Sequence, residues 1–96
     1  MTKKGYNYIL FSRKNGTLYV GVTNDLKRRI TEHKEGRYNT AFSFRYCVNK
    51  LGYFEEHQSI IEAIQREKFL KKFSRKRKIA LIEKFNPNWE DLYYQL

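Results

Sequence analysis

Residues 6–36 read YNYILFSRKNGTLYVGVTNDLKRRITEHKEG, and this stretch decides the fold. Two runs rich in aromatic and β-branched residues, 6–12 and 18–23, predict strands. Asn15-Gly16 between them is a dipeptide favoured in tight hairpin turns. The polar, charged residues that follow the second run are typical of a surface helix. The stretch therefore predicts a β-hairpin that leads directly into a helix.

Alternation along the two runs divides the hairpin into two faces. The apolar face holds Ile9, Phe11, Leu18, Val20 and Val22. The other face is more polar and carries Tyr8, Tyr19 and Gly21. A tight turn at Asn15-Gly16 places Gly21 opposite Leu10, where it leaves a gap that a ligand backbone could approach. Packing is the ordinary role of strand tyrosines, and both interpretations stay open here.

A helix is expected over residues 25–35, capped by Asp25 or the asparagine before it. Leu26 and Ile30 define its apolar stripe, and Arg29 and His33 fall inside that stripe. Arg29 and His33 lie one turn apart, close enough to act on a single group. A guanidinium holds a phosphate with two parallel hydrogen bonds. Either both side chains reach solvent at the edge of the stripe, or they build an anion site.

The remaining sequence predicts an α+β domain of ββαβααα order on a small sheet, with all 96 residues in one domain. The further elements are an ordered loop over 37–45, a strand within 46–56, a helix from Ser59 to Phe73, a helix from Ser74 to Phe85 and a short amphipathic terminal helix capped by Asn88. The second helix carries a capping box, since a glutamate lies three residues after its first serine.

Glu67 interrupts the apolar arc of that second helix. The arc comprises Ile60, Ala63, Ile64 and Leu70. A carboxylate on such a face needs a counter-charge because an unpaired buried charge is costly. Glu67 could pair with Arg29 in a structural salt bridge, or it could hold a hard divalent cation such as Mg²⁺. The sequence alone does not favour one of these two alternatives over the other.

The charge of the chain points to a polyanionic partner. Lys and Arg number 20 against 10 Asp and Glu, a formal net charge of +10. Basic residues concentrate in 66–78, where Lys68, Lys71, Lys72 and Arg75 recur at helical spacing. Such a ridge contacts phosphates without reading sequence. We therefore expect nucleic acid binding, the alternative being a solvated charged face.

Cys47 is the sole cysteine, which excludes an internal disulfide and a thiolate zinc site. Neither a disulfide-linked partner nor a membrane partner is expected, because no segment has the length of a membrane span. The N-terminus lacks the apolar run of a signal peptide. These features predict a cytoplasmic protein and leave its oligomeric state open.

Four features together resemble the GIY-YIG nuclease domain. They are Tyr6-Asn7-Tyr8, Tyr19-Val20-Gly21, an arginine ten residues after Tyr19, and Glu67 on a later helix. The stretches 18–36 and 63–92 look like the small, stand-alone bacterial branch of that superfamily. The resemblance implies a three-stranded antiparallel sheet flanked by helices. The first motif departs from Gly-Ile-Tyr but keeps the tyrosine that ends it.

The resemblance also implies roles for individual residues. Tyr8 and Tyr19 line the site, Arg29 matches the arginine that contacts the scissile phosphate, and His33 matches a frequent helper on the same helix. Glu67 matches the metal-binding carboxylate. An active-site asparagine found in some members has Asn86 as its nearest candidate here.

The resulting hypothesis is an endonuclease that hydrolyses nucleic-acid phosphodiester bonds with one Mg²⁺ or Mn²⁺. DNA is preferred over RNA as the substrate, with repair or recombination as the implied setting. Tyr19 or His33 would accept the proton of the attacking water, and histidine is better matched to neutral pH. One alternative is a nucleic-acid-binding module of the same fold with little or no turnover. The other is a basic structural protein with an Arg29–Glu67 salt bridge.

Overall fold

A computed structural model describes residues 4–36 and 47–96 of the chain. In chain order its elements are β1 (Gly5–Phe11), β2 (Leu18–Thr23), α1 (Leu26–Lys34), β3 (Lys50–His57), α3 (Ile60–Lys72), α4 (Arg75–Phe85) and the 3₁₀ helix η1 (Leu92–Gln95). The predicted α+β class is confirmed. The loop expected over 37–45 lies outside the described residues.

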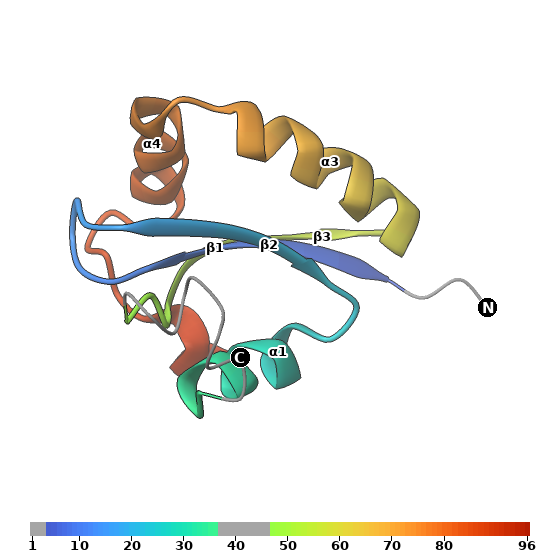
Figure 1. The fold of residues 1–96 in the computed structure, drawn as a ribbon, viewed down its shortest axis with the longest axis horizontal. Helices are drawn as coiled ribbons and strands as arrows, with labels where there is room; N and C mark the ends of the chain where they lie inside the picture. The colour runs from blue at the N-terminus through green and yellow to red at the C-terminus, as the bar shows by residue number, and fades with distance from the viewer. Residues whose placement is uncertain (1–3, 37–46) are drawn as a thin grey trace.

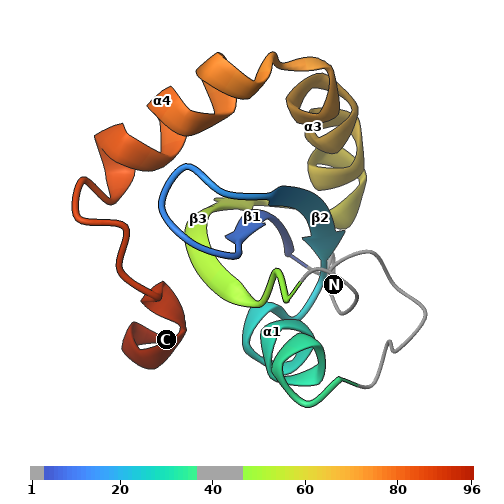
Figure 2. The ribbon, with the colours of Figure 1, turned by 60° about the vertical axis from the view of Figure 1, so that its left-hand side comes forward.

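The strands form one antiparallel sheet in the order β2-β1-β3. Helices α3 and α4 cover one face of the sheet, while α1 and η1 lie on the other face (Figure 1). Seen from a second direction, α3 lies over the β2 side of the sheet and α4 lies toward the opposite side (Figure 2). The sheet thus separates α1 from α3.

Each face of the sheet has its own apolar core. Toward α1 and η1 the buried residues are Tyr8, Leu10, Leu26, Ile30, Val48, Leu51 and Leu92. Toward α3 and α4 they are Ile9, Phe11, Val20, Tyr53, Leu70, Ile82 and Trp89. Successive β1 residues enter opposite cores because side chains alternate along a strand. The central strand is therefore buried on both faces.

The predicted hairpin register is wrong by two residues. Tyr8 pairs with Gly21, because the turn begins earlier than Asn15-Gly16. The carbonyl of Arg13 accepts a hydrogen bond from the Gly16 backbone N–H at 2.8 Å, so Asn15 is the third turn residue, with φ 58°. A shift of two keeps every side chain on its predicted face. The faces were therefore predicted correctly, and the cross-strand partners were not.

The predicted helix starts agree with the observed caps. Asp25, Ser59 and Ser74 each accept a hydrogen bond from a backbone N–H three residues later. The terminal element differs, since η1 begins after Asp91 and not after Asn88. Trp89 has φ 52°, a left-handed conformation that an α-helix cannot accommodate.

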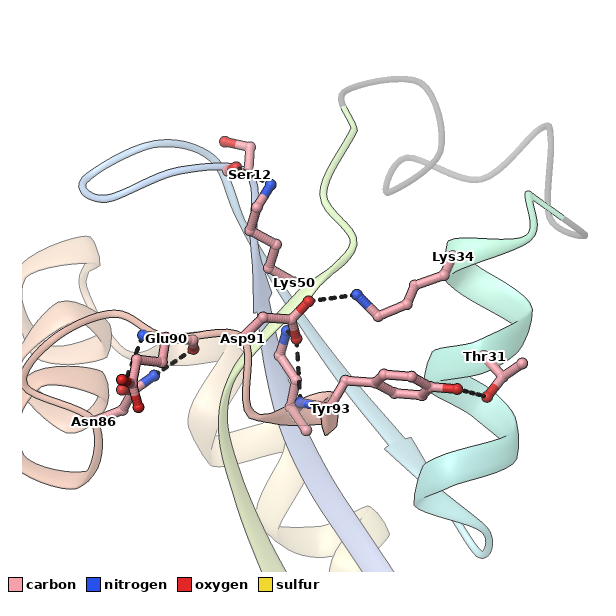
Figure 3. Close-up of polar contacts among 9 residues, drawn as sticks. Ser12, Thr31, Lys34, Lys50, Asn86, Glu90, Asp91 and Tyr93 are labelled. Atoms are coloured by element: carbon pink, nitrogen blue, oxygen red, sulfur yellow. Dashed lines mark hydrogen bonds and ion pairs between the residues drawn. The ribbon is translucent and has the colours of Figure 1, made fainter. Parts of the chain in front are cut away.

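The C-terminal segment fastens α1 to the sheet (Figure 3). The Asp91 carboxylate accepts hydrogen bonds from Lys34 Nζ at 2.5 Å and from the Leu51 backbone N–H at 3.0 Å. The hydroxyls of Tyr93 and Thr31 form a hydrogen bond at 2.7 Å. These contacts bind one flank of α1 to η1 and β3.

The apolar arc predicted on α3 is wrong at Ile64, which is 41% exposed. Ala63 and Leu70 are the residues of α3 that are fully buried. Arg66 and Glu67 are half-buried and lie on either side of the line that joins them. Glu67 therefore does not interrupt the buried face of α3, as the sequence predicted, but lies on one flank of it.

Candidate active site

Two strand tyrosines and a helix histidine meet on the α1 face of the sheet. The hydroxyl of Tyr8 and Nε2 of His33 are 3.4 Å apart, and one forms a hydrogen bond to the other. The His33 ring also meets Tyr19 edge to face, with ring centroids 5.6 Å apart. Tyr8 and His33 are buried, whereas Tyr19 is half-buried. These three of the predicted site residues are therefore brought together.

Gly21 makes room for this group. A Cβ atom built at Gly21 would lie 2.3 Å from Cζ and from the hydroxyl oxygen of Tyr8. The gap left by the glycine is therefore filled by the tyrosine ring, and not by a ligand as the predicted register implied. The sequence signal was the tyrosine-and-glycine pattern itself, but the contact needed the correct register.

Arg29 lies one turn before His33 on α1 and is half-buried. Burial, and then the positive charge of Arg29, lower the pKa of His33, with Glu32 acting in the opposite direction. At neutral pH the imidazole is therefore uncharged, and one of its ring nitrogens can accept a proton. The flank of α1 that carries Lys34 faces η1, because Lys34 contacts Asp91 at the start of η1. Arg29 lies on the opposite flank of α1. Arg29 consequently faces away from η1, toward the β2 side.

The lowered pKa of His33 predicts how stability depends on pH. Below the ordinary histidine pKa of 6.5 the unfolded chain takes up a proton that the native imidazole resists. The free energy of unfolding should therefore fall as the pH drops through and below that value. Above that value His33 is uncharged in both the native and the unfolded state, and it does not make stability depend on pH. Thermal melts from about pH 8 to about pH 5 should show a smaller loss for His33→Gln than for wild type. An equal loss in His33→Gln and in wild type would contradict the assignment.

Glu67 lies on α3, across the sheet from α1 (Figure 1). Its carboxylate is 3.6 Å from Lys71 Nζ, and its side chain is 18% exposed. Arg66, on the neighbouring flank of α3, donates to Glu55 of β3 at 2.8 Å. Glu67 must then lie on the flank turned toward β2. Within the described residues no ion pair joins Glu67 to Arg29, so the salt-bridge alternative is not supported there.

Arg29 and Glu67 thus share the β2 side of the molecule, each on a different face of the sheet. The two faces meet at the β2 edge, because β2 is the outer strand of the sheet order. Whether all five predicted site residues converge on one concave surface stays a prediction. In the tyrosine–histidine group of Tyr8, Tyr19 and His33, Tyr19 is the residue that lies on β2.

The residues fit a metal ion only if the substrate completes its coordination. In residues 4–36 and 47–96 no three side chains of His, Cys, Asp or Glu gather as a metal-binding cluster. Mg²⁺ is commonly held by one or two carboxylates together with phosphate oxygens and water. Glu67, partly exposed beside the β2 edge, fits that donor set, and it would be the residue that holds the ion.

The predicted basic ridge divides into two kinds of residue. Lys68, Lys71 and Lys72 are exposed on α3. Arg75 instead donates from its guanidinium to the backbone carbonyls of Asn15 and Gly16, which ties the hairpin turn to α4. Lys68 and Lys72 are therefore available for a ligand, and Lys71 is exposed although it also pairs with Glu67. Arg75 has a structural role that its sequence spacing did not indicate.

Asn86 is a structural residue in this fold. Its amide nitrogen donates to the carbonyls of Glu90 at 2.7 Å and of Gly52 at 3.3 Å. Its side-chain oxygen accepts the Glu90 backbone N–H at 3.0 Å. These bonds close the turn after α4 against β3, away from the tyrosine–histidine group. This geometry therefore does not support Asn86 as an active-site asparagine.

Sequence reasoning missed a polar network on β3. Glu55 accepts hydrogen bonds from Tyr53 at 2.5 Å and from Arg66 at 2.8 Å, and His57 lies 3.1 Å away. Burial and this carboxylate raise the pKa of Tyr53 to about 12, and the network lowers the pKa of Glu55 despite its burial. The available sequence signal was that Tyr53, Glu55 and His57 are alternate residues, which share one face of a strand. The network fixes α3 to β3.

Comparison with known proteins places this geometry in a family. The GIY-YIG catalytic domain model matches residues 4–80, which span the tyrosine–histidine group, Arg29 and Glu67. The chain belongs to the GIY-YIG family. Relatives include a UPF0213 protein of Bacillus licheniformis, 39% identical over 85% of this chain and 82% of that protein. Another is a UPF0213 protein of Syntrophus aciditrophicus, 36% identical over 88% of this chain and 94% of that protein.

A solved structure supports the same placement. The solution NMR structure of a UPF0213 protein from Bacillus halodurans matches with a TM-score of 0.55 and 30% identity, covering 92% of each chain. GIY-YIG membership means a nuclease family, whose substrates are nucleic acids and whose members generally use a divalent metal. Among the described residues, no helix combines the length and apolar character that crossing a membrane requires.

Proposed function

We propose that this GIY-YIG protein is an endonuclease that hydrolyses phosphodiester bonds of DNA with one Mg²⁺ or Mn²⁺. The observation that carries the proposal is the group formed by Tyr8, Tyr19 and an uncharged His33, with Arg29 one turn away on the same helix. Proton acceptors and a fixed cation beside each other suit attack of water on a phosphodiester. A cytoplasmic role in DNA repair or recombination accords with this activity.

In this proposal His33 is the final proton acceptor. The hydroxyl of Tyr8 is 3.4 Å from Nε2 and Tyr8 is 2% exposed, so this buried hydrogen bond orients the imidazole. The half-buried Tyr19, whose ring contacts His33, takes the proton of the attacking water and passes it to the imidazole. A tyrosine hydroxyl alone is a weak base at neutral pH because its ordinary pKa is near 10. The neutral imidazole behind it removes that difficulty. Tyr19, the more exposed of the two tyrosines, lies nearest to the approaching phosphate in this arrangement.

Arg29 and Glu67 have roles in stabilising the negative charge that develops during the reaction, Arg29 directly and Glu67 through a bound metal ion. The Arg29 guanidinium stabilises negative charge that builds on the phosphoryl oxygens. Glu67 would hold the divalent ion, which when bound supplies Lewis-acid stabilisation of the phosphate and of the leaving oxygen. Tyr19 and the two charged residues share the β2 side of the molecule, which supports a substrate path along that edge.

Phosphate contacts from the exposed α3 lysines should dominate affinity. Replacing Lys68, Lys71 and Lys72 with glutamine is expected to weaken binding about equally for unrelated sequences, because phosphate contacts carry no base information. The slope of log affinity against log salt should flatten by about 0.9 for each phosphate that a lysine no longer neutralises. Binding titrations of duplex DNA at several salt concentrations measure both quantities. Unchanged affinity at low salt would exclude this surface as the binding site.

Cleavage assays test the proposed reaction directly. End-labelled single-stranded, duplex, flap and branched substrates, of DNA and of RNA, are incubated with Mg²⁺ or Mn²⁺, and again with EDTA. We expect metal-dependent cleavage of at least one DNA substrate. Absence of cleavage across the panel by a preparation that binds DNA would reject the enzyme.

The second candidate function is a nucleic-acid-binding module with little turnover. The observation that favours it is the ion pair of Glu67 with Lys71, which occupies the proposed metal carboxylate on the far face of the sheet from α1. In this case the lysine substitutions still weaken binding, and no metal produces cleavage.

A further inference from the structure

The outer surface of α3 exposes large apolar side chains among lysines. Phe69 is 64% exposed and Ile61 is 65% exposed, although both belong to a regular helix that has a well-buried inner face. Lys68 and Lys72 flank Phe69 on the same outer surface. An aromatic ring held in water beside two cations has no role in either apolar core. An exposed ring bordered by charged side chains marks a candidate interaction surface.

A pocket lies at this position. It has a volume of about 290 Å³ and is lined by Gln65, Lys68, Phe69 and Lys72. The lining combines one aromatic face, one carboxamide and two ammonium groups. An aromatic face stacks on a planar ring, a carboxamide donates and accepts hydrogen bonds at a base edge, and ammonium groups neutralise phosphates. Each component corresponds to one part of a nucleotide.

We propose that this pocket, the outer α3 pocket, binds an unpaired nucleotide of the substrate, with its base stacked on Phe69 and its phosphates against Lys68 and Lys72. The proposal rests on the proposed function and specifies its substrate as DNA with a single-stranded part. A base inside a duplex cannot stack on Phe69, because its two faces are already covered by neighbouring bases. The pocket therefore selects unpaired nucleotides.

Charge decides between this occupant and a protein. The chain carries a formal net charge of +10, and two of the residues that line the pocket are lysines. A second copy of the chain would bring these lysines into a like-charged environment, which is unfavourable. An acidic protein would satisfy the lysines but does not require an aromatic ring or a carboxamide between them. A nucleotide uses every group in the pocket.

The pocket and the proposed site can act on one strand. Glu67 lies on the β2 flank of α3, and the outer α3 pocket lies about half a turn around the same helix, roughly 10 Å away across its diameter. Lys71 lies between them on the helix surface and pairs with Glu67. A strand crossing α3 therefore passes from the pocket over the lysines to the proposed metal carboxylate.

The test measures binding, and not cleavage. Anisotropy titrations of the full chain in EDTA compare labelled oligo(dT) with a blunt duplex. Phe69→Ala should lower affinity for oligo(dT) by about 5- to 100-fold, the range expected when one base can no longer stack, and should change duplex affinity by less than about 2-fold. Ile61→Ala is the matched control, since Ile61 is equally exposed on the same helix but does not line the pocket. It should leave both affinities unchanged.

Two further variants identify the contact. Phe69→Trp should retain binding, and oligo(dT) should quench its fluorescence, because the natural Trp89 is 7% exposed and gives little background response. Phe69→Leu should bind oligo(dT) as weakly as Phe69→Ala does. Wild-type affinity in Phe69→Leu would assign the surface to apolar protein contact and overturn the proposal. Unchanged affinity in Phe69→Ala, with salt-dependent duplex binding intact, overturns only this inference, whereas absence of all binding rejects the proposed function itself.

Discussion

Replacing Glu67 with glutamine is expected to abolish metal-dependent cleavage while leaving the protein folded. Glutamine keeps the shape of the side chain but removes the negative charge that a hard cation requires. Loss of that stabilisation should lower the cleavage rate by at least about 10²- to 10³-fold. Single-turnover cleavage of the best substrate measures the effect.

The stability of this variant follows from the observed ion pair. The Lys71 side chain is 58% exposed and the Glu67 side chain 18% exposed, so solvent screens the pair and replacing the carboxylate should cost no more than about 1 kcal/mol. In a domain of this size that corresponds to a melting shift of roughly 4–8 °C at most. A buried pair with Arg29 would instead have cost about 3–5 kcal/mol, because the change strands a charge.

Glu62→Gln is the matched control for this experiment. Glu62 lies on the same helix and is exposed, so it should not change cleavage. Because glutamine also suits its capping-box position, only the favourable interaction of the carboxylate with the helix N-terminus is lost, and melting should fall slightly. Melts with added Mn²⁺ give a second readout, since an ion bound to the native state raises the melting temperature of wild type and not of Glu67→Gln. Wild-type cleavage by Glu67→Gln would show that the carboxylate does not serve the reaction.

Gly21→Ala is expected to damage both stability and activity. The added methyl group would lie 2.3 Å from the end of the Tyr8 ring, which is 2% exposed and cannot swing into solvent. Overpacking of this kind costs about 1–3 kcal/mol. Because the displaced ring carries the hydroxyl that contacts His33, cleavage should fall as well. Chemical denaturation and single-turnover assays measure the two effects.

A double-mutant cycle separates the clash from other effects of the substitution. The atoms that meet the new methyl group are the terminal ring atoms of Tyr8, and Tyr8→Leu removes them. The stability losses of Gly21→Ala and Tyr8→Leu should therefore be less than additive in the double variant. Activity should stay low, since leucine has no hydroxyl. Additive losses would mean that the glycine is needed for a reason other than the ring.

Some features of this protein were determined by local sequence. The hairpin, the three serine and aspartate caps and the α+β class follow from period, turn residues and capping chemistry, which act over a few neighbours. Tyr8, Tyr19, Arg29 and His33 could be selected because their side chains depart from the apolar pattern on a predictable face. The family resemblance rested on those same residues, and the family match confirms it.

Tertiary structure decided the rest, because it depends on partners that are distant in the chain. The hairpin register followed from a four-residue turn over Arg13–Gly16, which begins one residue earlier than a turn with Asn15-Gly16 at its centre. The partner of Glu67 is Lys71 and not Arg29, because the sheet separates α1 from α3. The exposure of Phe69 depends on which side of α3 the sheet covers, and hydrophobicity alone predicts burial. The local pattern thus selected the chemical groups, and packing decided which of them meet.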